Sequence, residues 1–210
     1  MDKAIVILGS GSQGRISADL CCDMGLTLLG FLDDTKKRDT KVNGFPVLGG
    51  FSLAWDGSLG DRVAYTVALG DPFLRTKIFE KILSTGNEAV TIIHPKSFIS
   101  PSASIGVGSV ISPFCYIKAG ARIGRFCLLE VACSVGVDNI LGEGVFLGPS
   151  CHLNAICKIG EKSFLGTGTV VIPKRTIGAG VLIGAGSTVI EDIPPNKVAV
   201  GSPARVIKDR

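Results

Sequence analysis

The first residues whose types and spacing suit chemistry are the glycines of the segment GSGSQG, at positions 9, 11 and 14. They fit the pattern G-x-G-x-x-G, and they lie between an apolar segment, AIVIL, and an expected helix, which is the setting that gives the pattern meaning. Backbone amides at the start of such a helix can hold a phosphate group. The plainer alternative is that the glycines only allow tight packing of the strand against the helix.

Two carboxylates, Asp33 and Asp34, follow the next apolar segment, LTLLGFL, about twenty residues beyond the glycines. A carboxylate at this place can accept a hydrogen bond from a ribose or a base. NAD is the first ligand that this pattern indicates, but a different sequence pattern begins near residue 92, so the unit is too short for a dinucleotide. The sequence therefore favours a mononucleotide or nucleotide-sugar site.

The elements that must position these groups are alternating strands and helices. We expect strands in AIVIL, LTLLGFL, RVAYTVALG and VTII. A first helix is expected from about Arg15 to Met24, ended by Gly25, and a second helix begins at Asp71 and Pro72. Arg75, in that second helix, is expected to be a solvated side chain. Residues 1–91 thus form an α/β domain, a truncated Rossmann-like fold.

The rest of the chain, residues 92–210, has a repeat with a period of six residues. Every sixth residue from Ile93 to Val189 is Ile, Leu or Val, and the fourth residue after each of these is usually small. This is the hexapeptide repeat of a parallel β-helix, in which three hexads close one triangular coil of 18 residues. We expect the aliphatic residue to point into the prism and the small residue to fit where the corner narrows.

The repeat also explains most of the seven cysteines. Five of them occupy the same small interior position, and three of these are 18 residues apart, so they should stack in successive coils. The five are Cys115, Cys127, Cys133, Cys151 and Cys157. A small and weakly polar residue suits that corner. The spacing lacks the CxxC pairs of a zinc site, so we expect no metal and no disulfides.

Composition excludes several classes of partner. The net charge is +4, and the Lys and Arg residues are scattered, so the basic surface of a nucleic-acid-binding protein is missing. No apolar run approaches the roughly 18 residues of a membrane span, and the N-terminal apolar segment is too short for a signal peptide. We expect a cytoplasmic protein that binds small molecules.

The two patterns together resemble one known family. A truncated Rossmann-like domain with ILGSGSQG, GFLDD and ALGDPFLR, joined through IIHPKSFISPSASIG to hexads and ending in VAVGSPAR, looks like the hexapeptide-repeat sugar O- and N-acyltransferases. This family includes sialic acid O-acetyltransferases and bacterial nucleotide-amino-sugar N-acetyltransferases. The resemblance covers essentially the whole chain. It implies a left-handed β-helix, a homotrimer, and acetyl-CoA as co-substrate.

The resemblance also assigns residues to ligands. The nucleotide-linked sugar would be bound through the glycine turn and the acidic pair, which here are Gly9, Gly11, Ser12, Gln13, Asp33 and Asp34. Family members often have a histidine where this chain has Gln13. CoA would be bound along the later coils, near Ala155, Thr167, Gly168 and Ala185. For these four, the alternative is that every hexad corner has small residues.

The family's catalytic base is a histidine on a turn of the prism, and this chain lacks it. With ILGEG fixing the register, Val137 occupies the histidine position and Asp138 the acid that follows. Asp138 is one possible substitute, and His152, which should face outward almost one coil later, is another. His94, at the start of the β-helix, is expected to be structural.

Three interpretations follow. The first is an acetyl-CoA-dependent sugar acyltransferase of bacterial surface-glycan biosynthesis, which uses Asp138 or relies on an already neutral amine and on positioning. The second is a catalytically inactive relative that binds a nucleotide-sugar as a regulatory or binding protein. The third, a purely structural trimeric scaffold, would leave the glycine turn and the acidic pair unexplained.

Overall fold

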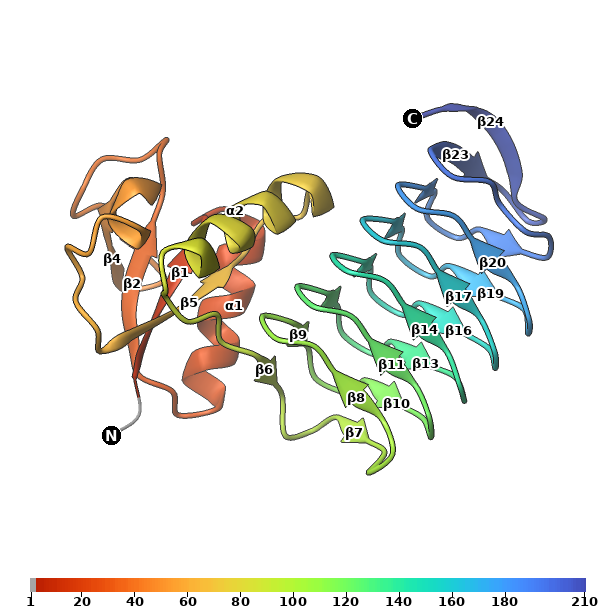
Figure 1. The fold of residues 1–210 in the computed structure, drawn as a ribbon, viewed down its shortest axis with the longest axis horizontal. Coiled ribbons are helices and arrows are strands. Elements are labelled where there is room, and N and C mark those ends of the chain that lie inside the picture. The colour runs from red at the N-terminus through yellow and green to blue at the C-terminus, as the bar shows by residue number, and fades with distance from the viewer. Residues whose placement is uncertain (1–2) are drawn as a thin grey trace. The chain divides into compact units, whose positions relative to one another are not determined.

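The computed structural model describes residues 3–210, and the chain divides into two compact units. Unit 1 ends at Thr91 and unit 2 extends from Ile92 to Arg210. Figure 1 shows the different character of the two, helices against a sheet in the first and stacked coils in the second. Among residues 3–210 there is no helix long and apolar enough to cross a lipid bilayer.

Unit 1 is a small α/β domain around one five-stranded sheet with the order β3-β4-β2-β1-β5. Strands β1, β2, β4 and β5 are parallel where they pair, and β3 is antiparallel to β4. The elements are β1 (Ala4–Leu8), α1 (Ser12–Asp23), β2 (Leu28–Leu32), β3 (Lys41–Val42), β4 (Phe45–Gly49), the 3₁₀ helix η1 (Phe51–Ala54), β5 (Val63–Val67) and α2 (Pro72–Ser84).

The sequence predicts most of these elements, with one shifted boundary. Helix α1 begins at Ser12, three residues before the expected start, because the last residues of the glycine motif already form its first turn. Its end is as expected, since Gly25 follows with φ +66°. Helix α2 begins as expected, and the Asp71 carboxylate caps it by accepting a hydrogen bond from the Leu74 amide at 2.8 Å.

The hairpin of β3 and β4 is absent from the expected elements. Its turn is Asn43–Gly44, and both residues have positive φ, 47° and 83°. Asn-Gly is the commonest pair in a two-residue hairpin turn, so the signal was available in the sequence. The Asn43 side chain ties this hairpin to α1 by donating to the Asp19 carboxylate at 2.9 Å.

Unit 2 is a left-handed parallel β-helix whose coils place two-residue strands on three faces (Figure 1), and it ends in two longer strands, β23 and β24, that are antiparallel to each other. The first face contains β7 (Phe98–Ile99), β10 (Tyr116–Ile117), β13 (Ser134–Val135), β16 (His152–Leu153), β19 (Val170–Val171) and β22 (Thr188–Val189). The second contains β8 (Ser104–Ile105), β11 (Arg122–Ile123), β14 (Ile140–Leu141), β17 (Lys158–Ile159) and β20 (Thr176–Ile177). The third contains β6 (Ile92–Ile93), β9 (Val110–Ile111), β12 (Leu128–Leu129), β15 (Phe146–Leu147), β18 (Phe164–Leu165), β21 (Leu182–Ile183), β23 (Lys197–Val200) and β24 (Arg205–Asp209).

The hexad aliphatics form the interior of the prism, as predicted. From Ile111 to Val189 they are all buried in one continuous core, while the earlier Ile93, Ile99 and Ile105 are partly buried against it. Neighbouring coils pair in register with an offset of 18 residues, for example Val135 with Leu153. Each coil therefore stacks its aliphatics on those of the next, which removes a continuous apolar column from water.

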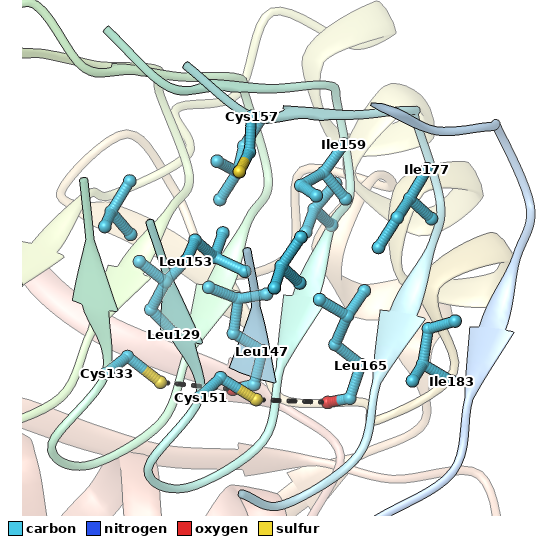
Figure 2. Packing of buried hydrophobic residues seen from close by; sticks show 14 of the residues in the cluster. Leu129, Cys133, Leu147, Cys151, Leu153, Cys157, Ile159, Leu165, Ile177 and Ile183 are labelled. Atoms are coloured by element: carbon cyan, nitrogen blue, oxygen red, sulfur yellow. Dashed lines mark hydrogen bonds between the residues drawn. The ribbon is translucent and has the colours of Figure 1, made fainter. Parts of the chain in front are cut away.

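The small interior position has a hydrogen-bonding role besides its size. All five hexad cysteines are buried free thiols, and Figure 2 shows Cys133 and Cys151 in consecutive coils with their sulfurs directed at carbonyl oxygens of the next coil. The Ser163 hydroxyl, in the same slot, donates to the Gly178 carbonyl at 2.8 Å and accepts from the Val181 amide at 3.1 Å. This interior position thus gives a hydrogen-bond partner to a small side chain with a polar hydrogen, which is what cysteine and serine share, while Ala121, Val145 and Val181 fill it by packing alone.

Candidate functional site

A cavity of about 630 Å³ lies in unit 1 at the carboxyl ends of β1, β2 and β5. This is the edge of a parallel sheet at which ligands of such folds bind. All six residues that the family resemblance assigns to the nucleotide-sugar line this cavity. The lining residues are Gly9, Ser10, Gly11, Ser12, Gln13, Asp33, Asp34, Thr35, Phe51, Ala68, Leu69, Gly70 and Leu74.

The three glycines of the turn have different reasons for being glycine. Gly9 has φ +95°, a conformation that other residues rarely adopt. A Cβ on Gly14 would overlap the carbonyl oxygen of Gly9, so Gly14 permits the close approach of the turn to the helix. Gly11 has an ordinary φ of −75°, and a Cβ there would meet no atom within 4 Å. Packing within the chain therefore does not require glycine at position 11.

Asp33 is fully occupied by hydrogen bonds within the chain. One carboxylate oxygen accepts from the amide and the hydroxyl of Ser10, and the other accepts from the amide and the hydroxyl of Thr35. Burial alone would raise the pKa of the Asp33 carboxyl, but these hydrogen bonds from Ser10 and Thr35 outweigh it and lower the pKa to about 2. A carboxylate offers about four lone-pair positions, so Asp33 has no acceptor left for a ribose or a base.

Asp34 and Gln13 have unused capacity at the same cavity. Asp34 is exposed, and one of its oxygens accepts from the Phe51 amide at 2.7 Å, while its second oxygen accepts from no described residue. The side-chain nitrogen of Gln13 is buried without a hydrogen-bond partner among the described residues. A buried amide nitrogen without an acceptor is unfavourable, so a bound ligand that supplied one would stabilise it.

Two basic residues near the cavity were missed or misjudged from the sequence. Lys36 is half-buried, and its ammonium group donates to the carbonyl oxygen of Ser10 at 2.8 Å. The expectation that Arg75 is a solvated side chain is wrong, because it is 1 % exposed. Its guanidinium donates to the carbonyl oxygen of Leu69 at 2.8 Å, so it holds the segment that lines the cavity after β5. A charged residue in a helix gives no sequence signal for such a backbone contact.

The turn between β13 and β14 places Val137 and Asp138 at the surface of the prism. Val137 is 40 % exposed, so an apolar side chain occupies an outward position. Asp138 has φ +56°, and its amide donates to the Ala119 carbonyl of the preceding coil at 3.0 Å. A Cβ on Gly120 would overlap the Asp138 carboxylate, so the carboxylate lies over the bare backbone of that glycine.

Neither histidine lies on this turn. His94 is 1 % exposed, and its Nδ1 accepts a hydrogen bond from the Lys96 amide at 3.2 Å. His152 is exposed on β16, as expected from the hexad phase, and it pairs in register with Ser134 of the preceding coil. Its strand therefore neighbours the strand that precedes the turn, and its role as a base stays a prediction.

A second cavity, of about 390 Å³, lies within unit 2 along β15, β18 and β21. Of the four residues assigned to CoA, Thr167 and Ala185 line it, whereas Ala155 and Gly168 do not. The sequence reasoning missed its aromatic wall, where the rings of Phe146 and Phe164 stack in parallel with centroids 4.4 Å apart. Each of these phenylalanines immediately precedes a hexad aliphatic, Leu147 or Leu165, and the two are 18 residues apart in adjacent coils. That offset was the available sequence signal.

Over the described part of the chain, no group of three or more His, Cys, Asp or Glu side chains has an arrangement that could hold a metal ion. Both cavities consist of backbone groups, hydroxyls, an acidic pair and apolar side chains. Such a surface can bind polar organic ligands by hydrogen bonds and packing.

Comparison with known families matches each unit separately. Residues 4–82 match the PglD N-terminal domain, and residues 156–191 match the bacterial transferase hexapeptide family, described as six repeats. Among curated proteins the matches are short and lie in part of the chain. The bifunctional protein GlmU from Rubrobacter xylanophilus is 68 % identical over 34 residues, 16 % of this chain and 7 % of that protein. The putative acetyltransferase C18B11.09c from Schizosaccharomyces pombe is 60 % identical over 37 residues, 18 % of each chain.

Solved structures match over nearly the whole length. A histidine-to-asparagine variant of perosamine N-acetyltransferase from Caulobacter crescentus, in complex with CoA and GDP-perosamine, has a TM-score of 0.93 at 32 % identity, covering 98 % of this chain and 97 % of that one. The acetyltransferase domain of PglB from Neisseria gonorrhoeae, in complex with acetyl coenzyme A, has a TM-score of 0.91 at 32 % identity, covering 99 % and 100 %. WeeI from Acinetobacter baumannii has a TM-score of 0.88 at 25 % identity, covering 98 % and 100 %.

Proposed function

This chain belongs to the family of hexapeptide-repeat sugar acyltransferases with a PglD-type N-terminal domain, and from that premise we propose its reaction and its ligands. The protein transfers an acetyl group from acetyl-CoA to an amine or hydroxyl of a nucleotide-linked sugar in bacterial surface-glycan biosynthesis. The main support is the whole-length similarity to an N-acetyltransferase that holds CoA and GDP-perosamine together. That relative's reaction favours an amine as the acceptor.

The two ligands are assigned to the two cavities. The nucleotide part of the acceptor sugar occupies the cavity of unit 1, where Gly9, Gly11, Ser12, Gln13 and Asp34 are available to it. Gly11 supports this assignment, because a glycine that the chain's own packing does not need is expected where a ligand approaches the backbone closely.

CoA is assigned to the cavity of unit 2, against Thr167, Ala185 and the stacked Phe146 and Phe164. Parallel aromatic rings offer an apolar wall to the slender pantetheine part of CoA. Ala155 and Gly168 lie outside this cavity, so a role for them requires that CoA extend beyond it.

The chemistry forms one bond and breaks another. The acceptor nitrogen attacks the thioester carbonyl carbon, the carbon–sulfur bond breaks as CoA leaves as its thiolate, and the acceptor nitrogen gives up a proton. We assign Asp138 as the group that takes this proton, because it is the ionisable side chain on the turn beside Val137. A carboxylate is a weak base, so the reaction also depends on positioning of an amine that is already neutral.

The family resemblance implies a homotrimer, and the sequence analysis predicts a cytoplasmic location; we propose both. A trimer of prisms would set the turn at Asp138 beside a neighbouring copy, which supplies the walls that one exposed turn lacks. Acetyl-CoA and nucleotide-sugars are small polar co-substrates of the cytoplasm, which fits the proposed location.

One observation favours a second function, that of a non-catalytic protein which binds a nucleotide-sugar. Val137, an exposed apolar side chain, stands where the family resemblance places the base. Loss of the base with retention of the nucleotide cavity is the pattern expected of a binding or regulatory subunit.

Titration and a thiol-release assay separate the two functions. Acetyl-CoA and a panel of UDP-, GDP- and dTDP-linked amino sugars are titrated calorimetrically into the purified protein, and CoA release is then followed with each sugar that binds. Release that falls at least about tenfold in Asp138→Asn, but not in the control Glu161→Gln on another turn, supports Asp138 as the base. Sugar binding without CoA release establishes the binding protein instead.

A further inference from the structure

Ser10 is held by two residues outside the glycine turn, by Asp33 at its amide and hydroxyl and by Lys36 at its carbonyl oxygen. Ser10 is buried, and its amide and hydroxyl both donate to the Asp33 carboxylate. Its carbonyl oxygen accepts from the Lys36 ammonium at 2.8 Å. Asp33 and Lys36 lie just after β2, so the end of one strand fixes the turn that follows another.

This hold determines where the next amide points. The carbonyl oxygen and the amide hydrogen of a trans peptide point in opposite directions. Since the Ser10 carbonyl is directed at Lys36, the Gly11 N–H is directed away from Lys36. The amides of Gly11, Ser12 and Gln13 donate to no described residue, and all three residues line the cavity. These are the free amides of a helix start, where an anion is stabilised.

We infer that Asp33 and Lys36 are positioning residues, which together orient the Ser10–Gly11 peptide so that its N–H faces the phosphate of a bound nucleoside diphosphate, and that Asp33 does not contact the ligand. This inference rests on the proposed nucleotide site. It gives the two neighbouring aspartates different roles: Asp34 has an oxygen free to accept a hydrogen bond from the ligand, and Asp33 has none.

Lys36 has a second effect through its charge. Its ammonium uses one hydrogen for Ser10, and it forms no ion pair with any carboxylate of the described residues. A positive charge without an ion-pair partner, hydrogen-bonded to the turn at Ser10, favours an anionic ligand over a neutral one, and this preference is stronger at low salt. The nucleoside part of the ligand should not sense it.

The test compares ligands with and without phosphates on the full-length protein. UDP, GDP, uridine and guanosine are titrated into the wild type, Lys36→Met, Lys36→Arg and the control Lys37→Met, whose side chain is the exposed neighbour. We expect Lys36→Met to bind the diphosphates about tenfold more weakly and to bind the nucleosides with unchanged affinity. Lys36→Arg should recover most of the lost diphosphate affinity, and Lys37→Met should bind every ligand like the wild type. In ¹⁵N-glycine-labelled protein, the downfield shift of the Gly11 amide on adding the diphosphate should shrink in Lys36→Met.

The proposed role of Asp33 is tested with Asp33→Asn, in which an amide nitrogen replaces one of the carboxylate oxygens that accept hydrogen bonds from Ser10 and Thr35. We expect diphosphate binding to weaken and the Gly11 shift to shrink, as in Lys36→Met. If this variant does not fold, Ser10→Ala, which removes the hydroxyl donor alone, should weaken diphosphate binding a few-fold. Either variant binding like the wild type contradicts the role of Asp33.

The outcomes keep the inference and the proposed function apart. If the wild type binds none of the diphosphates, the nucleotide site itself is wrong. If the wild type binds them and Lys36→Met is unaffected, the site stands and the positioning role is overturned. Equal losses for diphosphates and nucleosides in Lys36→Met would overturn it too, because they indicate a merely structural residue.

Discussion

The glycine turn of unit 1 and the Val137–Asp138 turn of unit 2 differ in which part of the residue, backbone or side chain, would carry out the proposed function. In the glycine turn the groups that we propose to bind the ligand are backbone amides, so binding there would depend on the shape of the turn. In the prism turn the shape recurs in successive coils, with positive φ at Gly120, Asp138, Ile156 and Lys174, so any chemistry there would depend on which side chains the turn has. A change in the shape of the first turn is therefore expected to affect folding as well, whereas in the second turn one side-chain substitution can remove the chemistry without any effect on the fold.

The structure is consistent with this difference in detail. Two residues maintain the conformation of the glycine turn. Gly14 allows its close approach to the helix, and Asp33 accepts hydrogen bonds from it. At the prism turn, Val137 is exposed and its carbonyl still accepts the Ile156 amide of the next coil at 2.8 Å. The backbone hydrogen bonds to the coils on either side are formed there, from Asp138 to Ala119 and from Ile156 to Val137, with an apolar side chain where the family resemblance places a base.

From the difference between the two turns, we predict the largest effect for Gly14→Ala, on the stability of unit 1. The added Cβ overlaps the buried Gly9 carbonyl oxygen, so unit 1 should lose about 3 kcal/mol or more of unfolding free energy. Trp55 is the only tryptophan and lies in unit 1, so its fluorescence during urea unfolding reports on this unit. A wild-type midpoint in this variant would show that the turn tolerates another shape.

The next largest effect is expected for Val137→His, which restores a base without altering the backbone of the turn. If the proposed reaction takes place there, kcat should rise about 10²-fold, with a new ionisation near pH 6.5 in the pH-rate profile. Ala119→His, on the exposed turn one coil earlier, is the matched control. Equal rates in the wild type and both variants would place the reaction elsewhere.

A smaller effect, of about tenfold on nucleotide affinity, is expected for Gly11→Ala. Its φ of −75° suits alanine and the Cβ meets no atom, so stability should be unchanged or higher by about 0.4–1 kcal/mol. The methyl group would separate the turn from the ligand, which calorimetric titration with UDP or GDP measures. Unaltered affinity would mean that the ligand does not approach this backbone.

The smallest effect concerns the acid dependence of unit 1. The pKa of Asp33 is about 2 in the folded chain, below the value of about 3.9 for a free carboxyl, so its contribution to stability is complete above about pH 4 and is lost as the pH falls through about 2. Asp33→Asn should be less stable at pH 7 and should lose less further stability between pH 4 and 2. Trp55 fluorescence monitors both, with Asp39→Asn as control; parallel pH profiles of wild type and Asp33→Asn would contradict the role of the ionised carboxylate.

Much of the architecture could be predicted from local patterns. The hexads fixed the interior residues of unit 2 and the cysteine positions, because a repeat stacks each residue on its counterpart 18 positions away. Gly25, Asp71 and Pro72 marked helix boundaries through their own backbone preferences. The hairpin at Asn43–Gly44 carried an equally local signal, and only the start of α1 was shifted, since the glycine motif forms part of the helix.

The sequence by itself determined the two folds, the family, and the absence of a histidine from the prism turn, since these depend on residue types at fixed spacings. Only the tertiary structure decided which residues of the proposed nucleotide site have hydrogen-bonding groups free for a ligand. Asp33 and Asp34 are chemically identical and adjacent, yet one is saturated by Ser10 and Thr35 and the other keeps a free oxygen. The contacts of Lys36 and Arg75 with backbone carbonyls near the cavity were likewise decided only by the tertiary structure. A side chain's partners depend on which segments folding brings within hydrogen-bonding distance.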